Sequence, residues 1–210
     1  MTASKRVQIP APLRLRRTQT ERTTETRERI MAAVVESIGE IGYPKTTATE
    51  IARRAGVSWG AVQHHFGDKE GILVAVLEES FNRFADALAG SIDADLPLAA
   101  RVSLFIDRSW LHFGSAQYRS TYEILINLPP GLAPAWQSEV LATWMRLWSN
   151  YFPENSGPER RTVNIMRYTV SVLSGLATMN MLEGAPDRNR TTELGYLKNT
   201  LTAELSGTSA

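Results

Sequence analysis

The chain has 210 residues, of which 43% are apolar and 21% charged, a composition typical of a soluble globular protein with a substantial core. It contains no cysteine, which excludes disulfides and thiolate metal sites and suits a reducing cytoplasm. The net charge is only +1, but residues 1–67 hold 11 Lys/Arg and 6 Asp/Glu whereas residues 68–210 hold 12 and 16, the asymmetry expected when one end of a protein meets nucleic acid phosphate.

The first 20 residues show no helical periodicity. Pro10 and Pro12 favour an extended backbone. Five basic residues occur here without an acidic one: Lys5, Arg6, Arg14, Arg16 and Arg17. We therefore expect a disordered basic arm over residues 1–20. Such an arm can follow a DNA groove or its phosphates and become ordered on binding, but a solubilising tail has the same composition.

A helix is predicted from Glu21 to Ile41, where Gly42 ends it. Its inner stripe is Ile30, Val34, Ser37, Ile38 and Ile41. Tyr43 and Pro44 link this helix to the next segment, and we expect Tyr43 to pack beneath that segment.

The stretch from Thr47 to Phe66 predicts two short helices joined by a tight turn. Thr47 and Glu50 have the spacing of a capping box, Gly56 supplies the left-handed residue of the turn, and Ser58 caps the second helix. A structural helical hairpin shares this pattern. A helix-turn-helix also has it, and its second helix can enter the major groove of DNA.

The rest of the chain is predicted to be helical, with no convincing strand. One long helix follows from Asp68 to about Ala89, with Asp68 as its N-cap. Further helices are expected over residues 98–113, 117–128, 134–152, 159–183 and 188–205. The longest uncharged run, residues 168–182, is too short and too polar for a membrane span, so no membrane contact is expected. The fold class is therefore all-α, with a domain over residues 21–67 and another over residues 68–210.

The segment from Thr26 to Leu73 resembles the N-terminal DNA-binding domain of the TetR family of transcriptional regulators. The matching features are Gly42-Tyr43, Thr46-Thr47, Ile51-Ala52, Ala55-Gly56-Val57-Ser58, Gly60, His65-Phe66 and Lys69-Glu70. One position differs, because the family usually has a phosphate-contacting Tyr where this chain has Gln63. A Gln can still donate to phosphate or bind adenine. The resemblance also implies that Lys69 contacts phosphate and that the helix from Asp68 is a lever between head and body.

We expect the DNA-binding residues to be Thr47, Ser58, Trp59, Gly60, Ala61, Gln63, His64, His65 and Lys69. Trp59 should be exposed and contact a thymine methyl or a sugar in the major groove, although packing against the basic arm is the alternative. His64 and His65 are adjacent and point about 100° apart on a helix, which suits phosphate contacts better than a shared metal ion.

The aromatic residues of the C-terminal region are the candidates for an effector cavity, although core packing is the alternative for each. TetR-like proteins typically hold such a cavity in the body. The expected ligand-binding residues are Ser109, Phe113, Tyr122, Trp144, Trp148 and Met166, with Ser109, Asn180 and Glu123 as candidate polar anchors.

The last two predicted helices carry more apolar surface than a monomer should need. We expect a homodimer with a four-helix interface, as the family resemblance also implies, while internal core is the alternative. The expected interface residues are Leu173, Leu176, Met179, Leu182, Leu194, Leu197 and Leu201.

Together these features predict a cytoplasmic, homodimeric, one-component transcriptional regulator, a repressor that binds a palindromic operator and is released by a small hydrophobic effector. A regulator controlled by a protein partner instead of a ligand is the alternative. An enzyme of the same fold is the second alternative, but three His, no Cys and no G-x-S-x-G motif leave little material for catalysis, and we expect no metal or cofactor.

Overall fold

The computed structural model of the protein describes residues 18–93, 95–128, 133–155, 160–185 and 189–207, and within these ranges the regular secondary structure is entirely helical. The all-α prediction is confirmed. The helices of the N-terminal part are α1 (Gln19–Ile41), the short 3₁₀ helix η1 (Tyr43–Lys45), α2 (Ala48–Ala55), α3 (Trp59–Phe66) and α4 (Lys69–Leu88). Those that follow are α5 (Leu98–Phe113), α6 (Ala116–Asn127), α7 (Ala133–Tyr151), η2 (Pro153–Asn155), α8 (Arg160–Leu182) and α9 (Thr191–Ser206).

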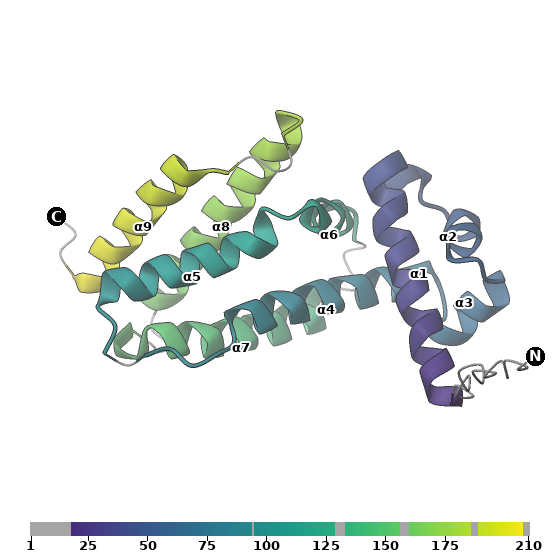
Figure 1. Cartoon of the computed structure of the whole chain (residues 1–210), viewed down its shortest axis with the longest axis horizontal. Helices are drawn as coiled ribbons and strands as arrows, with labels where there is room; N and C mark the ends of the chain where they lie inside the picture. Colours follow the sequence, from purple (N-terminus) through teal and green to yellow (C-terminus); the bar gives the residue numbers. More distant parts are fainter. Residues whose placement is uncertain (1–17, 94, 129–132, 156–159, 186–188, 208–210) are drawn as a thin grey trace, which may run out of the picture.

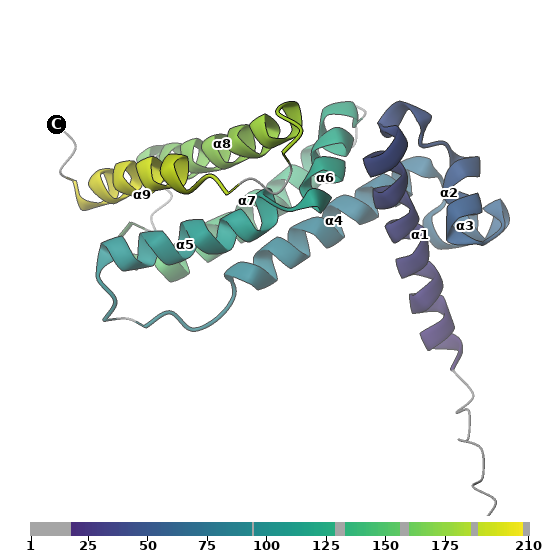
Figure 2. The ribbon, with the colours of Figure 1, turned by 45° about the horizontal axis from the view of Figure 1, so that its top comes forward.

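The molecule has a head at one end and a longer body (Figure 1). Helices α1, α2 and α3 form the head, and α4 runs from the head into the body. In the body, α5 lies between α4 and α7 on one side and α8 and α9 on the other, as the turned view also shows (Figure 2). Helix α6 lies where the body meets α1. None of the described helices is both long and apolar enough to cross a membrane.

Helix α1 begins two residues earlier than predicted because Thr18 caps it. The Thr18 hydroxyl accepts from the backbone N–H of Glu21 (3.2 Å), and the Glu21 carboxylate accepts from the N–H of Thr18 (2.7 Å). This capping box satisfies two amides that the first turn would otherwise leave without partners. The end of the expected arm, residues 18–20, therefore belongs to α1 and its cap, and the remainder of that arm lies outside the described residues.

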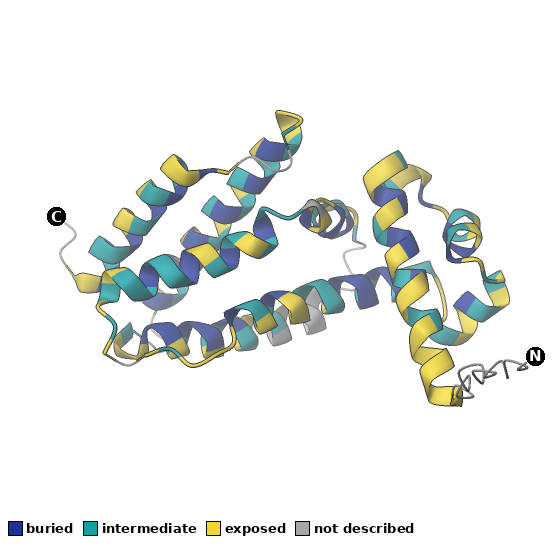
Figure 3. Ribbon diagram, in the orientation of Figure 1, coloured by how far each residue is buried: buried dark blue, intermediate teal, exposed yellow. Residues whose placement is uncertain are grey.

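Two hydrophobic cores lie along the molecule, and α4 contributes to both. Its first half places Ile72 and Leu73 in the core of the head, and its second half places Phe84 and Leu88 in the core of the body. Helix α6 also reaches the head, because Ile124 is fully buried in the head's core. The alternation of buried and exposed faces along these helices is visible in Figure 3. Head and body are thus joined by apolar packing as well as by the chain.

The leucines of α9 pack inside the subunit, which corrects part of the predicted dimer interface. Leu194, Leu197 and Leu201 are at most 4% exposed and belong to the body core, because α9 packs on α5 and α8. Leu173 of α8 is also fully buried there. Of the predicted interface residues, Met179 and Leu182 are the ones with exposed side chains, while Leu176 is half-buried.

Candidate nucleic-acid interface

Helices α2 and α3 form the predicted helix-turn-helix. Gly56 adopts a left-handed conformation (φ 62°, ψ 39°) that a side chain would disfavour, and it lets the chain reverse after α2. The N–H of Val57 then donates to the carbonyl of Ala52 (3.1 Å). Ile51 and Val62 are fully buried between the two helices and α1. The turn therefore fixes α3 against the head and leaves its outer face free.

Both predicted N-caps are present, but the predicted capping box of α2 is only half formed. The Thr47 hydroxyl accepts from the N–H of Glu50 (3.2 Å), and the Ser58 hydroxyl accepts from the N–H of Ala61 (3.2 Å). The Glu50 carboxylate, however, binds Arg53 and Arg54 instead of returning to the cap. Two guanidinium partners are stronger than one backbone N–H, so the carboxylate turns away from the helix start.

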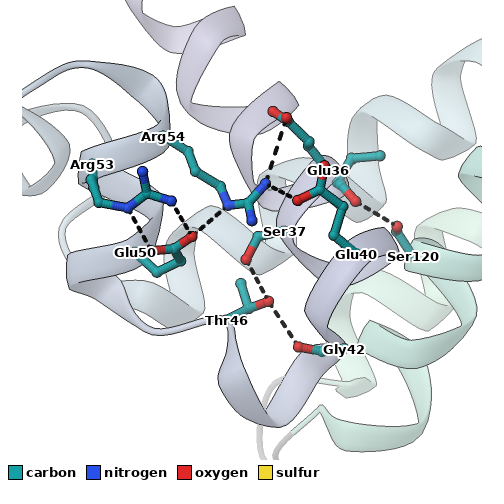
Figure 4. Close-up of polar contacts among 10 residues, drawn as sticks. Glu36, Ser37, Glu40, Gly42, Thr46, Glu50, Arg53, Arg54 and Ser120 are labelled. Carbon is teal, nitrogen blue, oxygen red and sulfur yellow. Dashed lines mark hydrogen bonds and ion pairs between the residues drawn. The ribbon is translucent and has the colours of Figure 1, made fainter.

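Arg54 is a structural residue of the head and does not present its charge to a ligand. Its guanidinium binds Glu50 (2.6 Å), Glu40 (2.7 Å) and Glu36 (3.5 Å), joining α2 to α1 (Figure 4). Only 11% of its side chain is exposed, whereas Arg53 is 66% exposed. Hydrogen bonds from Arg53 and then from Arg54 lower the pKa of Glu50 from its usual 4.5 to about 2. Of the two arginines beside the turn, Arg53 is thus the exposed one.

The expected DNA-binding residues form a mixed surface around α3. Gly60, Gln63 and His64 are exposed and lie on one stripe of the helix, three and four residues apart. Thr47 and Ser58 are exposed at the two helix starts. Ala61 and His65 are half-buried. The outer face of α3 thus presents one amide and one imidazole side chain to solvent.

Trp59 differs from its prediction. It is half-buried and packs against the core of the head, instead of standing exposed at the start of α3. The cause is that the first turn of a short helix lies close enough to the core for a large ring to bend back onto it. Its remaining exposed edge is what can contact a ligand.

His65 and Phe66 are held by a residue of α1 that the sequence did not single out. The Arg27 guanidinium donates to the carbonyl of His65 (3.1 Å) and lies 4.4 Å from the centroid of the Phe66 ring. The pKa of His65 is lowered mainly by burial and further by the neighbouring His64 and Arg27. Arg27 thus anchors the end of α3 to α1 by a hydrogen bond and a cation–π contact.

Lys69, in the first turn of α4, lies over Tyr43. Its ammonium nitrogen is 4.7 Å from the centroid of the Tyr43 ring, and desolvation lowers the pKa of Lys69. Asp68 caps the same helix by accepting from the N–H of Gly71 (2.8 Å). Tyr43 is half-buried and packs against the head's core, close to where it was expected.

A buried polar contact fixes the junction between α1 and α2. Thr46 is fully buried, its hydroxyl donates to the carbonyl of Gly42 (3.0 Å) and it lies 2.9 Å from the hydroxyl of Ser37 (Figure 4). The sequence held a signal for this contact, because Ser37 is the one polar member of the predicted inner stripe of α1. A buried hydroxyl at such a position needs a partner.

The expected ligand-binding residues lie in the packed core of the body. Trp148 is fully buried, and its ring meets those of Phe105 and Phe152 at centroid distances of 5.5 and 4.7 Å. The ring centroids of Trp144 and Phe84 are 4.6 Å apart. Phe113 and Met166 are also buried there, and Tyr122 is half-buried at its edge. Aromatic packing fills the space that the sequence predicted as a cavity.

Hollows of the described surface lie elsewhere. A groove of about 840 Å³ between α1, α4 and α6 is lined by residues including Met31, Val35 and Arg83. Another of about 640 Å³ between α8 and α9 is lined by residues including Arg160, Tyr168 and Glu204. The expected ligand-binding residues line neither of them.

Ser109 is unusual within the body core. Its side chain is fully buried, and its hydroxyl is the one described buried side-chain oxygen or nitrogen without a hydrogen-bond partner. One turn along α5, burial lowers the pKa of His112 to about 4, so its imidazole is neutral at pH 7. A buried hydroxyl without a partner has unused capacity to bind a polar atom.

The two other candidate anchors are engaged in other contacts. Asn180 accepts from the Arg190 guanidinium (2.7 Å) in the turn between α8 and α9. Glu123 accepts from the backbone N–H of Tyr43 (2.9 Å) in the head. Each side chain thus has a partner in a neighbouring element, and its role as a ligand anchor stays a prediction.

Comparison with known proteins agrees with this arrangement. Residues 30–76 match the family model described as bacterial regulatory proteins, tetR family, and these residues include α2, α3 and the first turns of α4. The head therefore resembles the regulatory proteins of the TetR family. The transcriptional regulator BetI of Escherichia coli is a relative with 38% identity over 68 residues, which are 32% of this chain and 35% of BetI. The matching part thus spans about a third of that relative.

Solved structures extend the likeness to the whole fold. The fatty acid degradation regulator FadR from Bacillus halodurans has a TM-score of 0.66 at 19% identity, over 84% of this chain and 94% of that one. The multidrug binding protein EbrR, solved with imidazole, has a TM-score of 0.62 at 19% identity, over 85% of this chain and 93% of that one. The likeness in sequence is therefore concentrated in the TetR-type head, while the body shares the fold.

Proposed function

We propose that this protein is a TetR-type transcriptional repressor that binds a palindromic operator through α3. The observation that carries the proposal is the exposed stripe of Gly60, Gln63 and His64 on a helix whose opposite face is buried in the head. A free helical face with amide and imidazole groups can donate hydrogen bonds to base edges and phosphates. Thr47, Ser58, Trp59, Ala61, His65 and Lys69 surround this stripe and complete the proposed surface.

The test is binding of the purified protein to DNA fragments selected from a genomic library, followed by fluorescence anisotropy on the selected site. Gln63→Ala should weaken binding to that site by ~1–3 kcal/mol while leaving nonspecific binding nearly unchanged. The matched control is Asn82→Ala, which removes an exposed amide from α4. Equal binding by Gln63→Ala and the control would overturn direct base contact by α3.

We also propose a dimer, formed by the outer face of α8 and α9. Four large side chains are exposed on these helices: Tyr168 (47%), Met179 (44%), Leu182 (76%) and Tyr196 (69%). Gly175 and Gly195 lie among them, and a Cβ at either position would meet no atom within 4 Å. Small residues beside large exposed ones let two helix pairs approach closely, which supports a two-fold interface.

The proposed effector is a small, neutral, largely apolar molecule that enters the body core. The support is chemical, because the core around Ser109 is aromatic, its histidine is neutral, and the Ser109 hydroxyl is available. A charged ligand would lose its hydration without gaining an opposite charge. The ligand would have to displace some of Phe113, Tyr122, Trp144, Trp148 and Met166, which belong to the packed body core or lie at its edge.

A neutral fluorescent probe, N-phenyl-1-naphthylamine, tests this site. Its emission should rise on binding, and Ser109→Ala, which removes the hydroxyl without adding bulk, should lower the affinity of hydroxyl- or amine-bearing ligands more than that of hydrocarbons. A natural effector that displaces the probe should weaken operator binding, and by linkage the operator should weaken effector binding by the same factor. Probe binding that leaves operator affinity unchanged would contradict an effector role for the core.

A further inference from the structure

Helix α6 belongs to the body but makes three separate contacts with the head. Ile124 is fully buried in the head's core, where Leu125 and Leu128 also pack. The Ser120 hydroxyl donates to the carbonyl of Val35 in α1 (3.0 Å; Figure 4). The third contact is the carboxylate of Glu123. These contacts place α6 at the one end of the body where it can affect the head directly.

Glu123 makes a directional contact with the start of the helix-turn-helix. One carboxylate oxygen accepts from the N–H of Tyr43 (2.9 Å), and the other accepts from Arg119 one turn earlier on α6 (3.1 Å). The Glu123 side chain is 21% exposed, so water competes little for it. A hydrogen bond from a backbone amide to a charged acceptor is short and depends steeply on geometry. Apolar packing at Ile124 tolerates sliding, whereas this bond does not.

The segment that receives this bond is stiff. Gly42 adopts φ 79°, and the Thr46 hydroxyl ties its carbonyl to the buried side of the turn. The N–H of Thr46 donates to the carbonyl of Tyr43 (3.1 Å), and Thr47 then caps α2. Because these bonds link residue 42 to residue 47 without a gap, a displacement at Tyr43 moves the start of α2.

Tyr43 also contacts the other end of the proposed DNA surface. Its ring lies under the ammonium group of Lys69, which begins α4 directly after α3. The backbone N–H of Tyr43 therefore binds Glu123, and its ring contacts Lys69. Tyr43 thus links α6 to the segment before α2 and to the helix that follows α3.

We propose that Glu123 is a positioning residue that couples α6 of the body to the DNA-binding surface through Tyr43. A shift of α6 that breaks the bond between Glu123 and Tyr43 releases the junction before α2 and the contact with Lys69. This route runs from α6 through Tyr43 and acts in addition to the continuous helix α4 that joins the head to the body. The inference rests on the proposed function, because it assigns the path by which the body changes DNA affinity.

The test is hydrogen–deuterium exchange on the full-length protein, with and without a nonspecific DNA duplex. Without DNA, Glu123→Ala should speed amide exchange in residues 42–47 by about fivefold to tenfold, because one charge-assisted bond is lost. Glu123→Gln keeps an acceptor oxygen and should have a smaller effect. In the wild type, DNA should slow amide exchange in both α3 and α6. In Glu123→Ala, DNA should slow exchange in α3 alone.

Glu154→Ala is the matched control, because Glu154 is also a partly exposed carboxylate bound to an arginine, at 2.6 Å from Arg101, but in η2 of the body. Circular dichroism shows whether each variant is folded. If Glu123→Ala does not fold, the exchange experiment is carried out with Glu123→Gln instead. Equal exchange of residues 42–47 in the Glu123 variants and in the control would overturn the inference. It would also be overturned if DNA slowed exchange in α3 of the wild type but not in α6. If DNA protects neither helix, the proposed function fails, and the inference fails with it.

Discussion

At the scale of single residues, the aromatic side chains of the body have a structural role that can be measured. Trp148 is fully buried between Phe105 and Phe152, and its indole N–H donates to the carbonyl of Asn155 (3.1 Å). Trp148→Ala should lower the free energy of unfolding by ~3–5 kcal/mol, the usual loss for a large aromatic in a packed interior. Chemical denaturation measures it.

Trp148→Phe is the informative comparison for that loss. It keeps most of the apolar contact but removes the donor to Asn155, so its effect should be clearly smaller. If Trp148→Ala left stability unchanged and altered only ligand affinity, Trp148 would be a wall of an open pocket instead of core.

Glu50 gives a pH dependence whose sign follows from its pKa. Its pKa in the folded protein is about 2, below its usual 4.5, because Arg53 and Arg54 hydrogen-bond the charged carboxylate. A lowered folded pKa contributes stability that is present above the unfolded pKa and is lost as the pH falls toward the folded one. The head should therefore lose stability between about pH 4.5 and about pH 2.

Thermal melting across this pH range, followed in wild type and in Glu50→Gln, measures the effect. The variant should be less stable near neutral pH and should show a shallower decline on acidification, since it has no proton to gain at this site. Coinciding curves for the two proteins would show that the Glu50 carboxylate contributes nothing to the stability of the head.

At the scale of helices, the sequence predicted most turns and caps, which depend on nearby residues of the chain. It predicted fewer of the contacts between helices. Gly56 and Ser58 locate the turn and the second cap, because left-handed geometry and capping are local properties. The start of α1 was missed although Thr18 and Glu21 have the same signature. The partner of Glu50 could not be predicted in this way, since it depends on which residues of α1 lie opposite α2.

The same limit applies to the faces of α8 and α9. Leucines repeating along α9 indicate one apolar face, but the repeat does not say whether α5 or a second subunit covers it. In the structure α5 covers it, and the exposed apolar residues are instead Tyr168, Met179, Leu182 and Tyr196. Likewise, Glu123 has no sequence feature that marks its contact with Tyr43, because 80 residues separate them.

At the scale of the whole molecule, the buried and the exposed faces of α8 and α9 predict different outcomes when a leucine is replaced by glutamate. Leu197→Glu places a carboxylate in the body core, where Leu197 is 2% exposed, and should unfold the subunit. Leu182→Glu changes a side chain that is 76% exposed and should leave the subunit folded while weakening the proposed dimer. Sedimentation velocity and thermal melting of both variants distinguish the two effects. A folded Leu182→Glu protein with the wild-type dimer strength would place the interface elsewhere.

Charge is also a property of the whole molecule, and it is concentrated outside the described head. Residues 18–67 hold six basic and six acidic residues, so the excess of positive charge in the N-terminal third comes entirely from the five basic residues of 1–17. Within the head, three glutamates surround Arg54. We therefore expect the proposed α3 surface to supply hydrogen-bonding groups and the arm to supply most of the attraction to phosphate.

A variant lacking residues 2–17 tests this division of roles. Each phosphate contact that a basic residue makes releases counterions, so the slope of log affinity against log salt should become shallower by up to about 4.5 per subunit if all five arm cations are engaged. Preference for the selected operator over random DNA should persist, since α3 is intact. Anisotropy titrations at several salt concentrations measure both quantities. An unchanged slope would mean that the arm is a solubilising tail and that Lys45, Arg53 and Lys69 account for the phosphate contacts.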